Sequence, residues 1–139
     1  MKRFLAVVCL YALTGSASAR NDPLVGSFTH NFTRVKNDPV WTVKKTGTAW
    51  HVRVHGANEP VHARLATNAE RAAFWEQMWW LADKAKDARC LRVEEHSPGL
   101  MCYVHGSTRA GIDALSKHKS DYFYFDPMGG LMEIRRKGT

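Results

Sequence analysis

Three runs of alternating apolar and polar residues between Trp41 and Leu65 constrain the fold more than any other feature of this chain. In each run an apolar side chain recurs at every second position, and polar or charged residues stand between. The apolar positions are Trp41, Val43, Trp50, Val52, Val54, Val61, Ala63 and Leu65. A period of two is typical of strands with one buried face. The pattern therefore predicts a three-stranded antiparallel meander with one apolar face.

The connections between these strands set the expected register. A two-residue turn at Thr46-Gly47 pairs Val43 with Trp50, and a four-residue loop over 57–60 joins the second strand to the third. Both choices place all apolar side chains on one face. A slip by one residue would send half of them to water, so the faces are strongly specified.

The opposite face of the predicted meander is basic. It carries Thr42, Lys44, His51, Arg53, His55, His62 and Arg64. In the expected register His55 lies opposite His62, and Arg53 lies opposite Arg64, although like charges directly opposite are mildly destabilising. Two interpretations remain open, a solvated basic face and a docking surface for an acidic partner. The candidate partner-binding residues on it are His51, Arg53, His55, His62 and Arg64.

A helix follows the meander. Thr67-Asn68-Ala69-Glu70 has the pattern of a capping box, so we expect a helix from Thr67 to about Lys86. At helical spacing one wide apolar stripe forms, and we expect it to cover the apolar face of the meander. The stripe consists of Phe74, Trp75, Met78, Trp79, Leu81, Ala82 and Ala85.

Trp80 falls outside that stripe, on the opposite side of the predicted helix. One interpretation is that another segment of the chain covers it. The other is that Trp80 is an exposed aromatic anchor, a residue type enriched at binding hot spots. Trp80 is therefore the sixth candidate partner-binding residue.

Two further hairpins complete the predicted β-structure. The first pairs Leu91 with Val104 and Val93 with Cys102, which leaves Cys90 facing away from Cys102. A disulfide between the two cysteines then requires a bulge or a bend near Cys90. The second turns near 127–130. The last hairpin is expected to place Phe123 and Phe125 on the face of Met132 and Ile134, and Tyr122, Tyr124, Glu133 and Arg135 on the other face.

The expected fold class is α+β, with about seven or eight antiparallel strands and one main amphipathic helix. A short helix or turn is expected from Arg109 to Lys117. Both an open curved sheet and a partly closed barrel fit the pattern.

The first residues have the three parts of a secretory signal: basic Lys2-Arg3, an apolar run over 4–13, and small residues ending at Ala19. The apolar run spans roughly ten residues, against roughly 20 that cross a bilayer. We therefore expect a signal peptide at 1–19, a single mature domain at 20–139, and a periplasmic or secreted location without stable membrane insertion. In an oxidising compartment Cys90 and Cys102 are expected to pair.

Charge favours an acidic partner. Loss of Lys2 and Arg3 with the leader lowers the formal net charge from +7 to +5. This charge is too modest and dispersed to indicate nucleic-acid binding, and it favours a protein with an acidic surface.

No complete catalytic or metal motif is present in the sequence. A nucleophile elbow of the Gly-x-Ser-x-Gly type is absent, and His51 and His55 lie about 13 Å apart along a strand. His55 and His62 come close in the expected register, but Arg53 and Arg64 flank them. We therefore expect no catalytic residues, no metal site and no cofactor, and a protein that is not an enzyme.

In outline, the exported, β-rich, disulfide-bonded domain resembles the small periplasmic immunity and lysozyme-inhibitor proteins of Gram-negative bacteria. The resemblance covers architecture alone and transfers no functional residue. It implies neutralisation of a secreted toxin or cell-wall hydrolase by protein–protein binding. The alternative is a small-ligand carrier or small periplasmic hydrolase with an aromatic-lined cleft, to which Trp41, Trp50, Trp75 and Trp79 could contribute.

Overall fold

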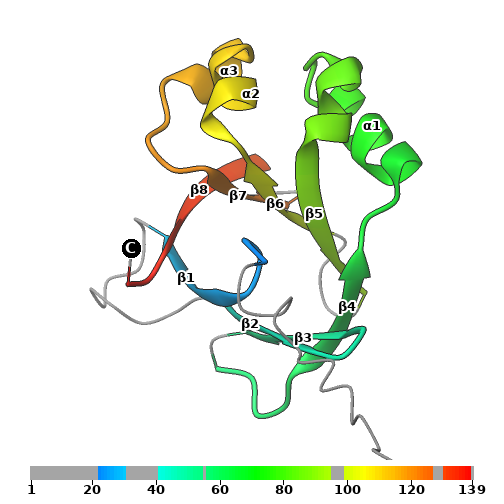
Figure 1. Ribbon diagram of the computed structural model, residues 1–139, viewed down its shortest axis with the longest axis vertical. Coiled ribbons are helices and arrows are strands. Elements are labelled where there is room, and N and C mark those ends of the chain that lie inside the picture. The colour runs from blue at the N-terminus through cyan, green and yellow to red at the C-terminus, as the bar shows by residue number, and fades with distance from the viewer. Residues whose placement is uncertain (1–21, 31–40, 55, 95–98, 127–129, 139) are drawn as a thin grey trace, which may run out of the picture.

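The computed structural model describes residues 22–30, 41–54, 56–94, 99–126 and 130–138, and its strands form a closed antiparallel barrel (Figure 1). The strands are β1 (Gly26–His30), β2 (Trp41–Thr46), β3 (Ala49–Val54), β4 (Val61–Leu65), β5 (Ala88–Val93), β6 (Leu100–Val104), β7 (Tyr122–Asp126) and β8 (Gly130–Arg136). Each strand pairs with the next along the chain, and β1 pairs with β8. The β-rich prediction is confirmed, and the barrel closes fully, which leaves no strand edge open.

The meander has the predicted faces but a different register. Val43 lies opposite Val52 and not Trp50, because the turn after β2 consists of Gly47 and Thr48. Gly47 adopts φ +60°, a left-handed conformation that glycine accepts readily. The shift is two residues, so every side chain keeps its face.

The next pair of strands is shifted by four residues from the expected register. His62 lies opposite His51, and the predicted partner His55 falls outside the described residues. Arg64 lies opposite Arg92 of β5. The expected pairing of Arg53 with Arg64 is therefore wrong, although both side chains remain on the outer face.

Two apolar clusters hold the structure together. One fills the barrel and contains Leu24, Phe28, Trp41, Val43, Trp50, Val52, Val61, Leu91, Val93, Met101, Tyr124 and Ile134. The other lies outside β5–β7, beneath the helices, and contains Ala66, Trp75, Ala85, Ala88, Cys90, Leu100, Cys102, Val104, Ile112, Leu115 and Phe123. Strands β5, β6 and β7 are therefore apolar on both faces.

The last hairpin is one residue out of the expected register. Tyr122 lies opposite Ile134 and Tyr124 opposite Met132, inside the barrel, whereas Phe123 and Phe125 face outward. The prediction that Tyr122 and Tyr124 lie on the face opposite Met132 and Ile134 is therefore wrong. It fails because the helices cover the outside of β7, so that face is apolar too.

Cys90 and Cys102 are directly opposite on β5 and β6 and form a disulfide, with their Cα atoms 4.1 Å apart. The predicted pairing of these cysteines is confirmed. The bulge expected near Cys90 is not needed, because Leu91 lies opposite Met101 and not Val104.

The helix after β4 begins as predicted and ends early. Helix α1 spans Asn68–Gln77, and Thr67 and Glu70 form both hydrogen bonds of the capping box. The chain then turns at Trp79, which has φ 61°, and continues as the 3₁₀-helix η2 (Ala82–Asp87). The expected single helix to Lys86 is therefore wrong.

All helical segments lie at one end of the barrel, and helices α2 (Gly106–Ala110) and α3 (Asp113–Ser116) connect β6 to β7 (Figure 1). Helix α1 packs on the outside of β5–β7, where Phe74 contacts Phe125 with ring centroids 3.5 Å apart. It does not cover the meander, whose apolar face is the barrel interior. Within the described residues, no helix is long and apolar enough to cross a membrane.

Candidate functional site

A basic groove lies on the outer face of β2 and β3, where the alternation of the strands turns polar side chains outward. It has a volume of about 400 Å³ and is lined by Thr42, Lys44, Thr46, His51, Arg53 and Pro60. Two cationic positions, Lys44 and Arg53, are exposed. Because the helices pack elsewhere, no helix of the described chain covers this surface.

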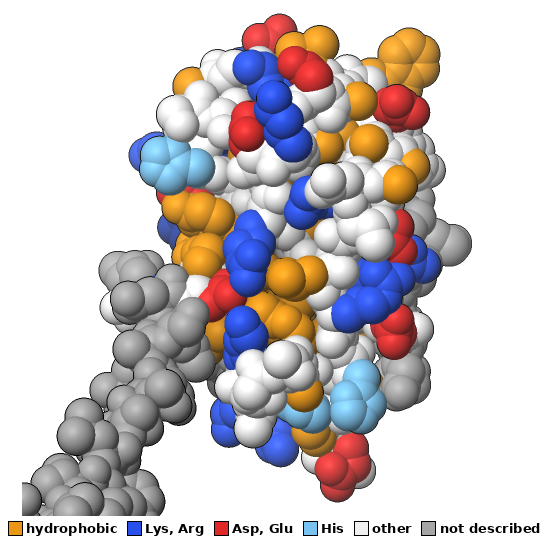
Figure 2. All heavy atoms as spheres, turned by 45° about the vertical axis from the view of Figure 1, so that its right-hand side comes forward, with side chains coloured by type: hydrophobic (Ala, Val, Ile, Leu, Met, Phe, Trp, Pro, Cys, Tyr) orange, Lys and Arg blue, Asp and Glu red, His pale blue; other side chains and the backbone are white. Residues whose placement is uncertain are grey.

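Two histidines meet at the edge of the basic groove. The ring centroids of His51 and His62 lie 5.1 Å apart, on neighbouring strands. Lys44 is directly opposite His51 on the other side, so three strands present basic or titratable groups in one row. Figure 2 shows histidine side chains at the lower end of the molecule, away from the helices.

The cations of the basic groove have no acidic partner among the described residues. The ion pairs in that part of the chain involve Lys45, Arg64, Arg89, Arg92, Arg109 and His118, and neither Lys44 nor Arg53. An exposed and unpaired cationic surface favours an anionic ligand. The fold thus brings together three of the predicted partner-binding residues, His51, Arg53 and His62, and places Lys44 beside them.

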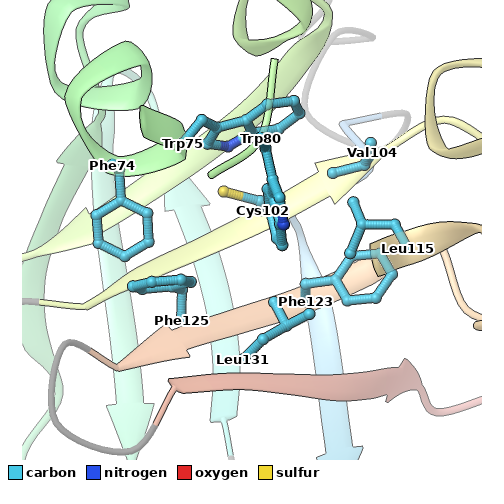
Figure 3. Close-up of a pocket in the computed structure, with 9 residues that line it drawn as sticks. All are labelled: Phe74, Trp75, Trp80, Cys102, Val104, Leu115, Phe123, Phe125 and Leu131. Carbon is cyan, nitrogen blue, oxygen red and sulfur yellow. The ribbon is translucent and has the colours of Figure 1, made fainter. Parts of the chain in front are cut away.

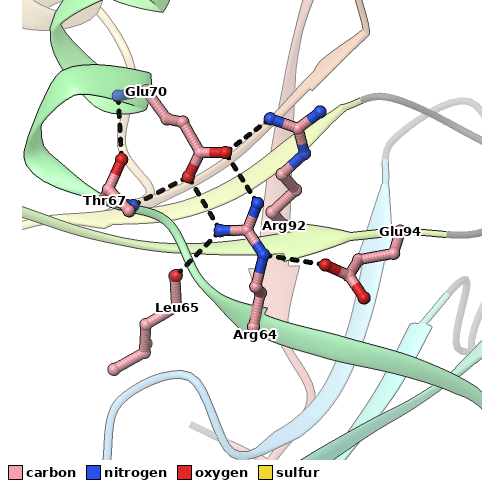
Figure 4. A network of polar contacts seen from close by, with 6 residues as sticks. All are labelled: Arg64, Leu65, Thr67, Glu70, Arg92 and Glu94. Carbon is pink, nitrogen blue, oxygen red and sulfur yellow. Dashed lines mark hydrogen bonds and ion pairs between the residues drawn. The ribbon is translucent and has the colours of Figure 1, made fainter.

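Arg64 does not belong to this groove and instead joins a polar network with α1 (Figure 4). Its guanidinium donates to both carboxylate oxygens of Glu70, at 2.8 and 2.7 Å, and to Glu94 at 2.8 Å. Arg92 donates to the same Glu70 at 2.6 Å. The hydrogen bond from Arg64, with that from the Thr67 amide, holds the pKa of Glu70 far below its usual range. This network fixes the start of α1 on β4 and β5.

Trp80 is half-buried, so the prediction that it is an exposed anchor is wrong. Its ring meets that of Trp75 edge-on, with centroids 5.4 Å apart. Figure 3 shows Trp80 among the apolar side chains beneath the helices. The exposed residue is its neighbour Trp79, which is 96% accessible. Continuous helical spacing could not reveal this, because the helix ends before Trp79.

The other tryptophans considered for a ligand cleft are core residues. Trp41 and Trp50 are buried inside the barrel, and Trp75 is buried in the outer apolar cluster. None of these three indoles offers a free face to a ligand.

The polar contacts that resemble catalytic pairs have structural explanations. Glu133 accepts hydrogen bonds from His118 at 2.8 Å and from backbone amides of 119–120. Burial raises the pKa of Glu133, but these hydrogen bonds outweigh it and leave that pKa below its usual value. Nδ1 of His105 accepts from the Ser107 amide at the start of α2. No group of three or more His, Cys, Asp or Glu able to hold a metal occurs among the described residues.

The chain matches no family model, no curated protein and no solved structure.

Proposed function

We propose that this chain is an exported, non-enzymatic binding protein whose basic groove docks an acidic protein surface. The observation that carries the proposal is the gathering of Lys44, Arg53 and the His51–His62 pair on a face that no helix covers. The use we assign to this binding is neutralisation of a secreted toxin or cell-wall hydrolase, as in an immunity or inhibitor protein.

The size and rigidity of the surface support a protein partner. The groove lies on paired strands of a closed barrel, so its backbone is fixed before binding, and no backbone ordering entropy is lost there. Lys44, His51 and His62 form a short row across three strands, and Arg53 lies two residues along β3 from His51. Such a compact group suits a cluster of carboxylates better than a nucleic-acid backbone.

An exported location is part of the proposal. The predicted signal peptide lies outside the described residues. The Cys90–Cys102 disulfide is compatible with an oxidising compartment, because cytosolic thiols are kept reduced.

Site-specific crosslinking tests the proposal. A photo-crosslinking residue replaces exposed Thr46 in the basic groove, and a second variant carries it at exposed Ala69 in the first turn of α1. Each mature variant is mixed with exported proteins of the source organism. We expect an adduct with an acidic protein from position 46 that is absent from position 69.

Charge reversal then checks the groove. With the purified partner, Lys44→Glu together with Arg53→Glu should weaken binding about 30-fold or more, the effect of removing a binding hot spot. The matched control reverses two exposed lysines at the helical end, Lys86 and Lys117. An equal loss of affinity in the groove variant and the control variant would refute the proposed docking surface, as would the absence of an adduct from position 46.

A small anionic ligand is the second candidate, favoured by an open cleft of about 420 Å³ at the helical end of the barrel. Tyr103 and Tyr122 lie in its lining with ring centroids 5.3 Å apart, beside Lys119 and Arg135. The Tyr103 hydroxyl can donate to an anion; burial raises its pKa, as does the neighbouring Asp121, which also lines the cleft. NMR shifts on titration with inorganic phosphate should include the backbone amides of Tyr103 and Tyr122 if this cleft binds anions; titration that leaves both amides unshifted would exclude it.

A further inference from the structure

Helix α1 ends in a Schellman motif. The amide of Trp80 donates to the carbonyl of Trp75 at 3.0 Å, and the amide of Trp79 donates to the carbonyl of Glu76 at 2.9 Å. The edge-on contact between the Trp75 and Trp80 rings is the apolar contact that accompanies this motif. The motif requires a left-handed backbone at the position of Trp79, which has φ 61°.

Tryptophan is a poor residue for that position. Glycine is preferred there, because a Cβ in the left-handed region crowds the following carbonyl. Trp79 is the one non-glycine residue with positive φ in the described chain. Its side chain is 96% exposed, so packing does not compensate for the strain. Strain held in place by its surroundings is a feature of functional positions.

The surroundings of Trp79 form an apolar projection. Leu81 beside it is 58% exposed, and a cleft of about 410 Å³ separates this turn from α2 and α3. Met78, Trp79, Trp80, Leu81 and Ile112 contribute apolar side chains to the cleft. We call Trp79 and Leu81 the tryptophan knob. Figure 2 shows exposed hydrophobic side chains at the helical end, with acidic ones among them.

The one charged residue that lines the cleft beside Trp79 is acidic, Asp113. Along the chain Glu76 precedes the knob, and Asp83 and then Lys84 follow it. No described residue forms an ion pair with these three carboxylates.

We propose that the tryptophan knob is a second docking site, which inserts Trp79 into an apolar pocket edged by Lys or Arg on a protein partner. The acidic rim complements such a pocket. The same rim opposes an anionic membrane, and in a symmetric dimer it would face its own copy. The site is independent of the basic groove, which lies on β2 and β3.

The decisive variant is Trp79→Gly, because it separates binding from folding. It removes the indole and relieves the left-handed strain, so the midpoint of thermal unfolding should rise by a few degrees. Binding of the partner should weaken about 30-fold, as for a buried tryptophan hot spot. The matched control is Leu65→Ala, which truncates an exposed apolar side chain of β4.

The partner is identified with a photo-crosslinking residue in place of exposed Gln77, the last residue of α1. The mature protein is mixed with exported proteins, and the adduct is identified, purified and titrated. Support requires an adduct that excess wild type competes away and Trp79→Gly does not. It also requires weaker binding at higher salt and after Glu76→Gln with Asp83→Asn.

Three results would overturn the proposal. One is an adduct between two copies of the chain, together with a Trp79-dependent dimer in sedimentation. Another is Trp79-dependent cosedimentation with phosphatidylcholine–phosphatidylglycerol vesicles. The third is the absence of any Trp79-dependent adduct while Trp79→Gly remains folded.

Discussion

Trp79 and Asp22 differ in what they contribute to the fold, and we propose a binding role only for Trp79. Trp79 contributes nothing visible to packing and occupies a strained backbone position. Asp22 lies at the end of the barrel, where its carboxylate accepts from the Leu24 amide and from Arg89, with Lys45 at 3.9 Å. The residue types alone do not distinguish these roles, since both depend on local geometry.

Trp79→Gly should stabilise the protein by about 1 kcal/mol, because glycine accepts the left-handed conformation without strain. Trp79→Ala keeps a Cβ at the same position and should leave stability nearly unchanged. Urea unfolding of both variants gives the comparison. A loss of stability in Trp79→Gly would show that the indole packs in the native state after all.

Asp22 should contribute stability that depends on pH. Burial raises its pKa, but hydrogen bonds from Arg89 and the Leu24 amide, with the charges of Arg89 and Lys45, outweigh this and hold the pKa below its usual value. The contribution is therefore present above the unfolded pKa and is lost as pH falls through the folded pKa.

Unfolding free energies of wild type and Asp22→Asn should accordingly differ near pH 7 and converge in acid. The control is Asp87→Asn at the exposed end of η2. A difference between wild type and Asp22→Asn that stays constant down to pH 2 would contradict the ion-pair explanation.

Among the elements, α1 depends most on its first turn. Thr67 accepts from the Glu70 amide, and the Glu70 carboxylate accepts from the Thr67 amide and from Arg64 and Arg92. Thr67→Ala should therefore cost about 1 kcal/mol of stability.

Glu70→Gln should be milder than Glu70→Ala, because glutamine can still complete the capping box while losing the charge. Chemical unfolding measures the stability of both variants, and far-ultraviolet circular dichroism measures their helix content. Equal losses in the two variants would mean that the ion pairs with Arg64 and Arg92, and not the cap, stabilise this turn.

The strands were predictable from the sequence because alternation specifies faces, and shifts by two or four residues preserve those faces. The exact register could not be predicted, because the local sequence is equally compatible with a turn at Gly47 and Thr48 and with one at Thr46 and Gly47. The two faces of β7 were assigned the wrong way round because both of them are buried. Phe123 and Phe125 pack under the helices, and Tyr122 and Tyr124 line the barrel interior, so polarity does not distinguish the faces. The end of α1 was missed because no local signal marks Trp79 as left-handed.

The candidate site was predictable in part for the same reason. His51, Arg53 and His62 were assigned to one outer face by alternation alone, and the fold brings them together. Arg64 was assigned to the same face correctly but to the wrong neighbours, because its partner Glu70 belongs to a helix that packs at that edge. Such a contact depends on tertiary packing and not on strand periodicity.

For the whole molecule, the disulfide links β5 and β6 beneath the helices, where both barrel and helical layer meet. Cys90→Ala with Cys102→Ala should lower the unfolding free energy by about 3 kcal/mol on the chain-entropy estimate for a loop of this length. Urea unfolding of oxidised wild type and the double variant measures it. An unchanged free energy would indicate that the unfolded chain stays ordered around this hairpin.

The two docking surfaces that we propose lie apart on the molecule, the basic groove on β2 and β3 and the tryptophan knob at the helical end. Their separation predicts that charge changes at one surface leave binding at the other unaffected. The groove carries the proposed function.

The most direct measurement of that function is the affinity of the acidic partner crosslinked from position 46, determined by calorimetry for wild type, Lys44→Glu with Arg53→Glu, and Lys86→Glu with Lys117→Glu. We expect a loss of about 30-fold or more in the groove variant and a far smaller loss in the helical-end variant. Equal affinity of the groove variant and wild type would contradict docking at the basic groove.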